Sequence, residues 1–165
     1  MDIIIKPMET GDEIRGKAFV HWKGWQESYR GMVDDGYLDR MTLAQTEEKA
    51  FRWRDGILVA KDGARVVGFV GYGPAHGEDG AGEVYALYVL AEYQHRGIGY
   101  ALLRRALDGL AGCRVIHLWA FAENKKALRF YERVGFHPDG TEKEIVLGAP
   151  ARGVRLTLAR EEACP

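Results

Sequence analysis

The sequence predicts an α/β (α+β) fold in which a mixed, mostly antiparallel sheet is flanked by helices. Two changes of pattern along its 165 residues support this prediction. Apolar residues recur at helical spacing in the first third of the chain, whereas short apolar runs separated by turns follow from Ile57. From Glu83 onward, strand and helix patterns alternate. A chain of this length can bury one core, so we expect a single domain over residues 1–165.

The first third of the chain is expected to form a short strand and two helices. Four aromatic residues recur every three or four positions and give one helix an aromatic face: Phe19, Trp22, Trp25 and Tyr29. Glycines and aspartates at residues 31 and 34–36 break this helix. Thr42, followed three residues later by a glutamine, predicts a capping box at the start of the other helix. The expected elements are a strand over residues 3–6 and helices over residues 14–30 (with a start at 10–13) and 43–54.

The rest of the chain is expected to supply strands and two further helices. Asp62 and Gly63 between two apolar runs are a strong hairpin signal. The run over residues 83–90 is almost continuously apolar, as expected for a strand that is covered on both faces. The expected strands cover residues 57–60, 66–72, 83–90, 115–120, 144–147 and 154–158, and the expected helices cover 97–110 and 124–134.

Charge and cysteine content argue against several classes of protein. The chain has 23 basic and 24 acidic residues and a net charge of −1, so we expect neither nucleic acid nor an anionic membrane as a partner. The apolar runs are too short to span a bilayer and the N-terminus lacks the features of a signal peptide, so a cytoplasmic location is expected. Cys113 and Cys164 make no disulfide framework, and the histidines show no metal-ligand spacing, so no metal site is expected.

A glycine turn between the strand at 83–90 and the next helix predicts an anion site. Backbone N–H groups at a helix start point toward a ligand, and glycine lets the backbone approach it closely. Gly97 and Gly99 supply this turn, although a plain strand-to-helix turn explains the same glycines. A dinucleotide fingerprint is not met, because Leu102 stands where its third glycine belongs and the next acidic residue is Asp108. The P-loop pattern is not met either, because no Gly-Lys-Ser/Thr follows.

A second motif, N-x-x-A-x-x-F-Y-E-x-x-G-F, runs from Asn124 to Phe136. Asn124 is a suitable N-cap, apolar residues follow at helical spacing, and Gly135 stands where the residue after a helix end belongs. An ordinary amphipathic helix with a half-buried tyrosine explains the apolar stripe. It does not explain why this helix accompanies the glycine turn.

With both motifs in order and at matching separation, the chain resembles the GCN5-related N-acetyltransferase (GNAT) superfamily. The sequence Q-H-R-G-I-G at residues 94–99 is similar to the family's cofactor loop, Q/R-x-x-G-x-G/A, and the second motif is similar to its other signature. The resemblance covers about residues 57–136. It implies acetyl-CoA as co-substrate, and it implies that the strands at 83–90 and 115–120 splay apart around the pantetheine arm.

The resemblance also implies which residues bind acetyl-CoA. Backbone amides of the turn would hold the pyrophosphate, and Arg96 would add charge unless it is a solvated surface residue. Asn124 would contact the cofactor or act only as an N-cap. A basic cluster either meets the 3′-phosphate or forms a solvated face: Lys125, Lys126 and Arg129. The expected cofactor-binding residues are Leu87, Val89, Gln94, His95, Arg96, Gly97, Ile98, Gly99, Tyr100 and Asn124.

Amide formation requires an amine that loses a proton and a departing thiolate that gains one. Tyr131 is expected to act as general acid, because the family often places a tyrosine at this point of the motif for that role. The alternative is a packed aromatic with a satisfied hydroxyl. Glu83 is expected to act as general base, because family members that use a strand glutamate place it at this distance before the cofactor loop. The alternative is a strand-end charge.

These residues favour an enzyme that moves an acetyl group from acetyl-CoA to a primary amine of a small molecule or peptide, by direct attack in a ternary complex. The alternative is a CoA-binding sensor or interaction module without turnover, and a longer-chain acyl donor is a weaker one. Homodimers are common among similar proteins. Acidic and aromatic side chains suit a cationic amine, and the candidate substrate contacts are Trp22, Trp25, Glu27, Tyr29, Asp34, Asp35, Glu78 and Asp79.

Overall fold

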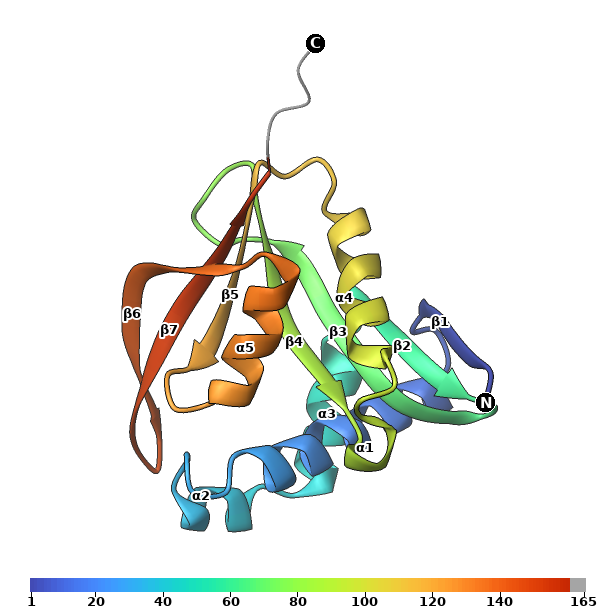
Figure 1. The fold of residues 1–165 in the computed structure, drawn as a ribbon. Helices are drawn as coiled ribbons and strands as arrows, with labels where there is room; N and C mark the ends of the chain where they lie inside the picture. Colours follow the sequence, from blue (N-terminus) through green and yellow to red (C-terminus); the bar gives the residue numbers. More distant parts are fainter. Residues whose placement is uncertain (161–165) are drawn as a thin grey trace.

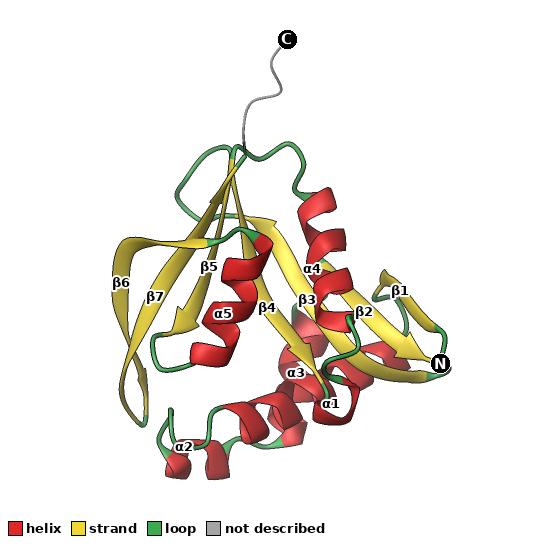
Figure 2. Ribbon diagram, viewed as in Figure 1, coloured by secondary structure: helices red, strands yellow, loops and turns green. Residues whose placement is uncertain are grey.

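The computed structural model describes residues 1–160, and within them the chain forms one seven-stranded sheet between two layers of helices (Figure 1, Figure 2). The strand order is β1-β2-β3-β4-β5-β7-β6, and each neighbouring pair is antiparallel except β4–β5. The predicted fold class is confirmed. The strands are β1 (Ile3–Pro7), β2 (Ile57–Asp62), β3 (Arg65–Pro74), β4 (Ala81–Val89), β5 (Val115–Phe121), β6 (His137–Leu147) and β7 (Ala149–Ala159). The helices are α1 (Gly11–Ser28), α2 (Asp35–Arg40), α3 (Leu43–Arg52), the 3₁₀ turn η1 (Ala91–Tyr93), α4 (Ile98–Gly109) and α5 (Lys125–Val134).

The first three helices lie on one side of the sheet, and α4 and α5 lie on the other (Figure 2). Two glycines bring α1 close to the strands, because a Cβ on Gly16 would lie 2.8 Å from Val66 and one on Gly24 would lie 2.9 Å from Tyr88. On the opposite face, Leu102 of α4 is fully buried. The central strands β3 and β4 are therefore covered on both faces, and they carry the main core.

Short-range sequence signals correctly placed helix starts and the first hairpin. The Thr42 hydroxyl accepts a hydrogen bond from the Gln45 amide (3.2 Å), and the Gln45 side chain accepts one from the Thr42 amide (3.2 Å). The predicted capping box is therefore confirmed. The hairpin between β2 and β3 is also confirmed, with Asp62 paired to Arg65 across a turn in which Gly63 has a φ of +58°. Both features depend on residues only three apart in the chain, which is why the sequence reveals them.

The structure differs from the prediction in two segments. Residues 34–36 do more than end the first helix, because the Asp34 side chain accepts from the Tyr37 amide (3.0 Å) and caps α2. The last two strands are much longer than the predicted 144–147 and 154–158, since β6 and β7 pair from His137↔Thr157 to Leu147↔Ala149. Most of β6 is exposed and carries no apolar alternation, so the long ladder with β7 defines this strand.

A small apolar cluster lies apart from the main core, where the end of α1, α2 and the β6–β7 hairpin meet. Val33, Leu38 and Phe121 are buried in it. The turn of the hairpin touches the start of α2, because a Cβ on Gly148 would lie 2.6 Å from the Asp34 carboxylate. This contact joins the last strands of the sheet to the helices that precede it in the chain.

Candidate active site

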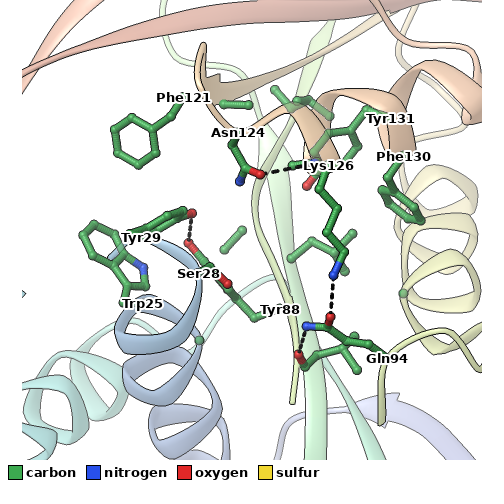
Figure 3. Close-up of a pocket in the computed structure, with 18 of the residues that line it drawn as sticks. Trp25, Ser28, Tyr29, Tyr88, Gln94, Phe121, Asn124, Lys126, Phe130 and Tyr131 are labelled. Atoms are coloured by element: carbon green, nitrogen blue, oxygen red, sulfur yellow. Dashed lines mark hydrogen bonds between the residues drawn. The ribbon is translucent and has the colours of Figure 1, made fainter. Parts of the chain in front are cut away.

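The two central strands separate and open a cleft. β4 and β5 pair over four residues only, from Ala81↔Val115 to Val84↔Leu118, and their C-terminal parts diverge. The predicted splay of these strands is confirmed. The cleft between them has a volume of about 1010 Å³ and is bordered by the end of α1, the turn before α4, and α5 (Figure 3).

A β-bulge lies in β4 where the strands begin to separate. Val84 pairs with Tyr72 and Ala86 pairs with Gly71, so Tyr85 is an extra residue without an opposite partner. The Tyr85 hydroxyl donates to the carbonyl of Pro74 on β3. Bulges of this kind bend a strand and are frequent beside active sites. This bulge directs the end of β4 along the wall of the cleft.

The turn that leads into α4 has an unusual backbone. In the part of the chain that the structure describes, His95 is the one non-glycine residue with a positive φ (+60°), and Gly97 follows with +80°. Alternating left- and right-handed residues direct successive N–H groups to one side and form an anion site. The first hydrogen bond of α4 runs from the Ala101 amide to the Gly97 carbonyl (3.0 Å), so the preceding amides have no helical acceptor. A non-glycine residue in the left-handed conformation lowers the stability of the fold by about 1–3 kcal/mol, and residues of this kind are frequent in turns at functional sites.

The Gln94 side chain braces this turn. Its Nε2 donates to the Val89 carbonyl (3.0 Å), and its Oε1 accepts from Lys126 Nζ (2.9 Å), which links the turn to β4 and α5 (Figure 3). The Arg96 guanidinium lies over the Tyr93 ring, with 5.5 Å between its carbon and the ring centroid. The Arg96 side chain therefore packs outside the cleft lining.

Most residues predicted to bind the cofactor come together in the cleft. Eight of the ten line it: Leu87, Val89, Gln94, His95, Gly97, Gly99, Tyr100 and Asn124. The Arg96 side chain lies elsewhere, and the Ile98 side chain is buried in the core. These two residues could therefore contact an anion in the cleft only through their backbone amides.

The second motif forms α5, which borders the cleft as predicted. Asn124 Oδ1 accepts from the Ala127 amide (3.2 Å), so this residue caps the helix while it also lines the cleft (Figure 3). Two turns later, Tyr131 borders the same space. Its hydroxyl makes no hydrogen bond to any described residue, and burial, with a smaller effect from Tyr29, raises the pKa of this phenol. Tyr131 is therefore a protonated phenol that has a free donor in the cleft.

A pair of tyrosine hydroxyls lies across the cleft and was not predicted. The hydroxyls of Tyr29 on α1 and Tyr88 on β4 are 2.9 Å apart (Figure 3). Burial raises the pKa of both phenols. The sequence signals only an aromatic face on α1 and an apolar strand at β4. Neither pattern reveals that these two side chains meet.

Glu83 lies at the closed end of the separation between the strands. It belongs to the paired part of β4, opposite His117 on β5, and its side chain does not line the cleft. Burial raises the pKa of Glu83, while Lys143, His76 and other nearby cations act in the opposite direction. A carboxylate with a raised pKa is a stronger base than an exposed one. Tyr131 and Glu83 thus do not share one cavity wall.

A chain of polar side chains surrounds the buried His117 beside Glu83. His117 Nε2 lies 2.8 Å from Glu78 Oε2, and its Nδ1 lies 2.7 Å from the Thr157 hydroxyl. That hydroxyl donates to Asp139 (2.8 Å), which also accepts from Arg155 Nε (2.6 Å). Because the single hydroxyl proton of Thr157 is used on Asp139, Nδ1 of His117 is the donor toward Thr157. The chain fixes the histidine ring across three strands.

Several residues that were candidates for contact with the substrate or with the 3′-phosphate of the cofactor have internal partners. Asp34 caps α2 through the Tyr37 amide, and Glu78 bonds to His117. Lys125 of the basic cluster donates to the Ala122 carbonyl (2.8 Å). These contacts support the fold, and the predicted substrate contacts that do border the cleft are Trp25, Glu27 and Tyr29. Cys164 lies outside the described residues.

Comparison with known proteins agrees with this geometry. Residues 20–136 match the acetyltransferase (GNAT) family. YuaI of Bacillus subtilis, named an uncharacterized N-acetyltransferase, is 32% identical over 165 residues, which is 89% of this chain and 93% of YuaI. The chain belongs to the GNAT family.

Solved structures of two N-acetyltransferases have the same fold. The PaiA N-acetyltransferase of Thermoplasma acidophilum, in complex with coenzyme A, superimposes with a TM-score of 0.74 at 19% identity, over 97% of this chain and 100% of that one. The ribosomal-protein-S18-alanine N-acetyltransferase of Escherichia coli has a TM-score of 0.70 at 18% identity, over 99% and 97% of the two chains. As a GNAT protein, the chain is an acetyl-CoA-dependent acyltransferase.

The cleft of this GNAT protein fits two parts of acetyl-CoA, the pyrophosphate and the pantetheine arm. The left-handed turn at His95 and Gly97 presents unbonded amides, as a pyrophosphate requires. The diverging strand ends leave backbone groups of β4 free toward an extended arm. When bound, acetyl-CoA supplies an activated acetyl group. The side chains of Tyr29, Tyr88 and Tyr131 surround the space that remains.

Proposed function

We propose that the protein transfers an acetyl group from acetyl-CoA to a primary amine of a small molecule or peptide, by direct attack in a ternary complex. The observation that carries this proposal is the presence of two unlike features in one cleft. One is an anion-binding turn with free amides, and the other is a buried phenol, Tyr131, without a hydrogen-bond partner. A module that only binds CoA needs the first feature and has no need of the second.

Tyr131 and Glu83 fit the two proton transfers of the reaction. The amine nitrogen bonds to the thioester carbon, the carbon–sulfur bond breaks, and an amide and the CoA thiol are formed. Glu83 takes the proton that the amine loses through water, because its side chain does not line the cleft, and its raised pKa suits a base. Tyr131 gives a proton to the departing thiolate from a hydroxyl that makes no hydrogen bond to any described residue. Burial raises the pKa of this phenol, so it is protonated at neutral pH but is a weaker acid than an exposed tyrosine. One proton thus moves from nitrogen to sulfur overall.

Thiol release from acetyl-CoA tests the proposal. We expect release above the amine-free rate with at least one pool of acceptors among polyamines, aminoglycosides, amino acids and peptide N-termini. Tyr131→Phe should lower kcat by about 100-fold or more, as expected when a general acid is removed. Acetyl-CoA binding, measured by titration calorimetry, should persist. Tyr93→Phe is the matched control, because its hydroxyl bonds to Asp62 outside the cleft.

The assigned base has its own test. Glu83→Gln should lower kcat/KM, whereas Glu142→Gln on the exposed strand β6 should not. If acetyl-CoA binds and no acceptor pool raises thiol release, the protein is a CoA-binding module and the roles of Glu83 and Tyr131 are wrong. Competition between acyl-CoA molecules of different chain length reveals a longer-chain donor.

Three further properties of the protein are still predictions: a single domain, a possible homodimer and a cytoplasmic location. A sheet that runs from residue 3 to residue 159 supports a single N-acetyltransferase domain over 1–165. β6 is an edge strand of this sheet, which makes it available for pairing in a homodimer. In residues 1–160, no helix is both long and apolar enough to cross a membrane.

A further inference from the structure

The end of the cleft that lies against α1 is lined by apolar and aromatic side chains. Tyr29 packs edge-on against Trp25 and against Phe121, with ring centroids 5.0 Å apart in both pairs (Figure 3). Ile145 and Leu147 of β6 border the same space. We call these five side chains the apolar end of the cleft.

Charged groups of the cleft lie mostly elsewhere. The basic ones come from α5 and from the turn before α4. Among the described residues that line the cleft, Glu27 is the one carboxylate, and its Oε1 lies 3.4 Å from Lys23 Nζ. A polyamine or an aminoglycoside carries several ammonium groups, and each one needs an anionic or strongly polar partner when it is buried. The apolar end has no such partners for a second ammonium group.

The tyrosine pair offers a place for one amino group. The hydroxyls of Tyr29 and Tyr88 are 2.9 Å apart, and one of them donates to the other. The pair therefore keeps one O–H donor and free oxygen lone pairs. Because both side chains border the cleft, these neutral groups can orient one amine where the apolar end begins.

The hairpin turn contacts the start of α2 beside the apolar end. A Cβ on Gly148 would lie 2.6 Å from the Asp34 carboxylate, so the backbone of this turn is in direct contact with the start of α2. Val33 and Leu38 are buried behind this contact. With the hairpin turn packed against α2 at this place, the apolar end suits a small acceptor better than it suits an extended chain.

We infer that the apolar end binds the acceptor, and that the acceptor is a small monoamine whose non-reacting part is a hydrocarbon chain or ring. This inference rests on the proposed acetyl transfer to a primary amine. The apolar end buries the hydrocarbon part, and the Tyr29–Tyr88 pair holds the amino group. A free amine of this kind and the apolar first residue of a peptide share the same chemistry, so the test includes both.

Acetylation rates of matched amines test the inference on the unmodified protein. The series runs from n-propylamine to n-hexylamine, with phenethylamine, spermidine and a leucine-initiated peptide as further arms. We expect kcat/KM to rise about 3- to 4-fold for each added CH₂ group, as full burial of a methylene predicts. Spermidine and the peptide should fall at least tenfold below n-hexylamine.

The outcomes separate the inference from the proposed function. A flat alkylamine series, or spermidine or the peptide as the best acceptor, overturns the inference while acetyl transfer itself stands. No release with any amine, measured together with acetyl-CoA binding, overturns the proposed function and the inference with it. A rising series with poor use of spermidine and the peptide supports both.

Two variants of β6 test whether the preference for alkylamines depends on the apolar end of the cleft. Leu147→Asp should lower kcat/KM for n-hexylamine at least tenfold and raise the ratio of spermidine to n-hexylamine use. Val146→Asp is the control, because this neighbouring side chain is 64% exposed and does not line the cleft. Equal effects of the two variants, with unchanged circular dichroism, would contradict the placement. Ile145→Thr is a milder change at the same site if Leu147→Asp does not fold.

Discussion

Replacing Glu13 with glutamine should lower the free energy of unfolding at neutral pH, because this carboxylate ties β1, β2 and α1 together. It is 4% exposed. Lys6 Nζ lies 2.9 Å from both of its oxygens, and Lys61 Nζ lies 3.0 Å from Oε1. The backbone amides of Glu9 and Thr10 donate to Oε2 at 2.8 and 3.2 Å. A neutral amide keeps the shape of the side chain but places N–H groups against these donors.

The magnitude follows from the pKa of this carboxyl group. Burial opposes ionisation, but the hydrogen bonds from Glu9, Lys6, Lys61 and Thr10 outweigh it and lower the pKa of Glu13 from 4.5 to about 2. At ~1.4 kcal/mol per pH unit, this difference corresponds to about 3 kcal/mol of stability. Because the folded pKa lies below the unfolded one, the stabilisation is complete above 4.5. It is lost as the pH falls through about 2.

Urea unfolding followed by circular dichroism at pH 7, 5 and 3.5 measures the effect. The difference between the wild type and Glu13→Gln should be about 3 kcal/mol at pH 7, and it should shrink by about 1–1.5 kcal/mol at pH 3.5. Glu9→Gln is the matched control, because Glu9 also pairs with Lys6 (2.9 Å) but is 66% exposed. Its cost should stay below about 1 kcal/mol. A difference for Glu13→Gln that does not change with pH, or that equals the control, would refute this reasoning.

Three further substitutions test the backbone and the polar chain. Gly56→Ala should lower the free energy of unfolding by more than about 2 kcal/mol and should therefore lower the melting temperature. The reason is that Gly56 has a φ of +70° and the new Cβ would lie 2.2 Å from the Tyr72 carbonyl oxygen. Gly97→Ala has space but a φ of +80°, so it should cost about 1–2 kcal/mol of stability and weaken acetyl-CoA binding about tenfold in titration calorimetry. Unchanged affinity would remove this turn from the binding site. Thr157→Val leaves Nδ1 of His117 without its partner and should cost about 1–3 kcal/mol in urea unfolding, whereas no loss would contradict the polar chain.

Local patterns identified much of the cofactor half of the site. The glycines of the turn, the N-cap at Asn124 and the order of the two motifs depend on neighbouring residues only. Eight of the ten predicted cofactor-binding residues accordingly line the cleft. The sequence was less informative about side chains that could point either into the cleft or away from it. Arg96 packs on Tyr93, and nothing in its sequence neighbourhood distinguishes this position from one that faces a phosphate.

The part of the cleft that we propose for the acceptor depended on contacts between distant segments. Tyr29 and Tyr88 are 59 residues apart, and their hydroxyls meet because Gly24 brings α1 close to β4. Glu78 and His117 are 39 residues apart, so a residue that was a candidate for binding substrate is instead bonded to a histidine. Helix α2 depends on its cap at Asp34, and the full length of β6 depends on its pairing with β7. The local apolar pattern reveals neither feature.

The sequence by itself determined the fold class, the capping box at Thr42, the hairpin at Gly63 and the glycine turn before α4. The fold class follows from the order of helix and strand patterns along the chain. The capping box, the hairpin and the turn are each set by neighbouring residues, whose geometry is fixed by backbone sterics and local hydrogen bonds. Only the tertiary structure decided where the strands separate, which tyrosines face each other and which carboxylates are already bonded. Those features arise from packing between segments that are far apart in the chain, and no short-range pattern encodes them.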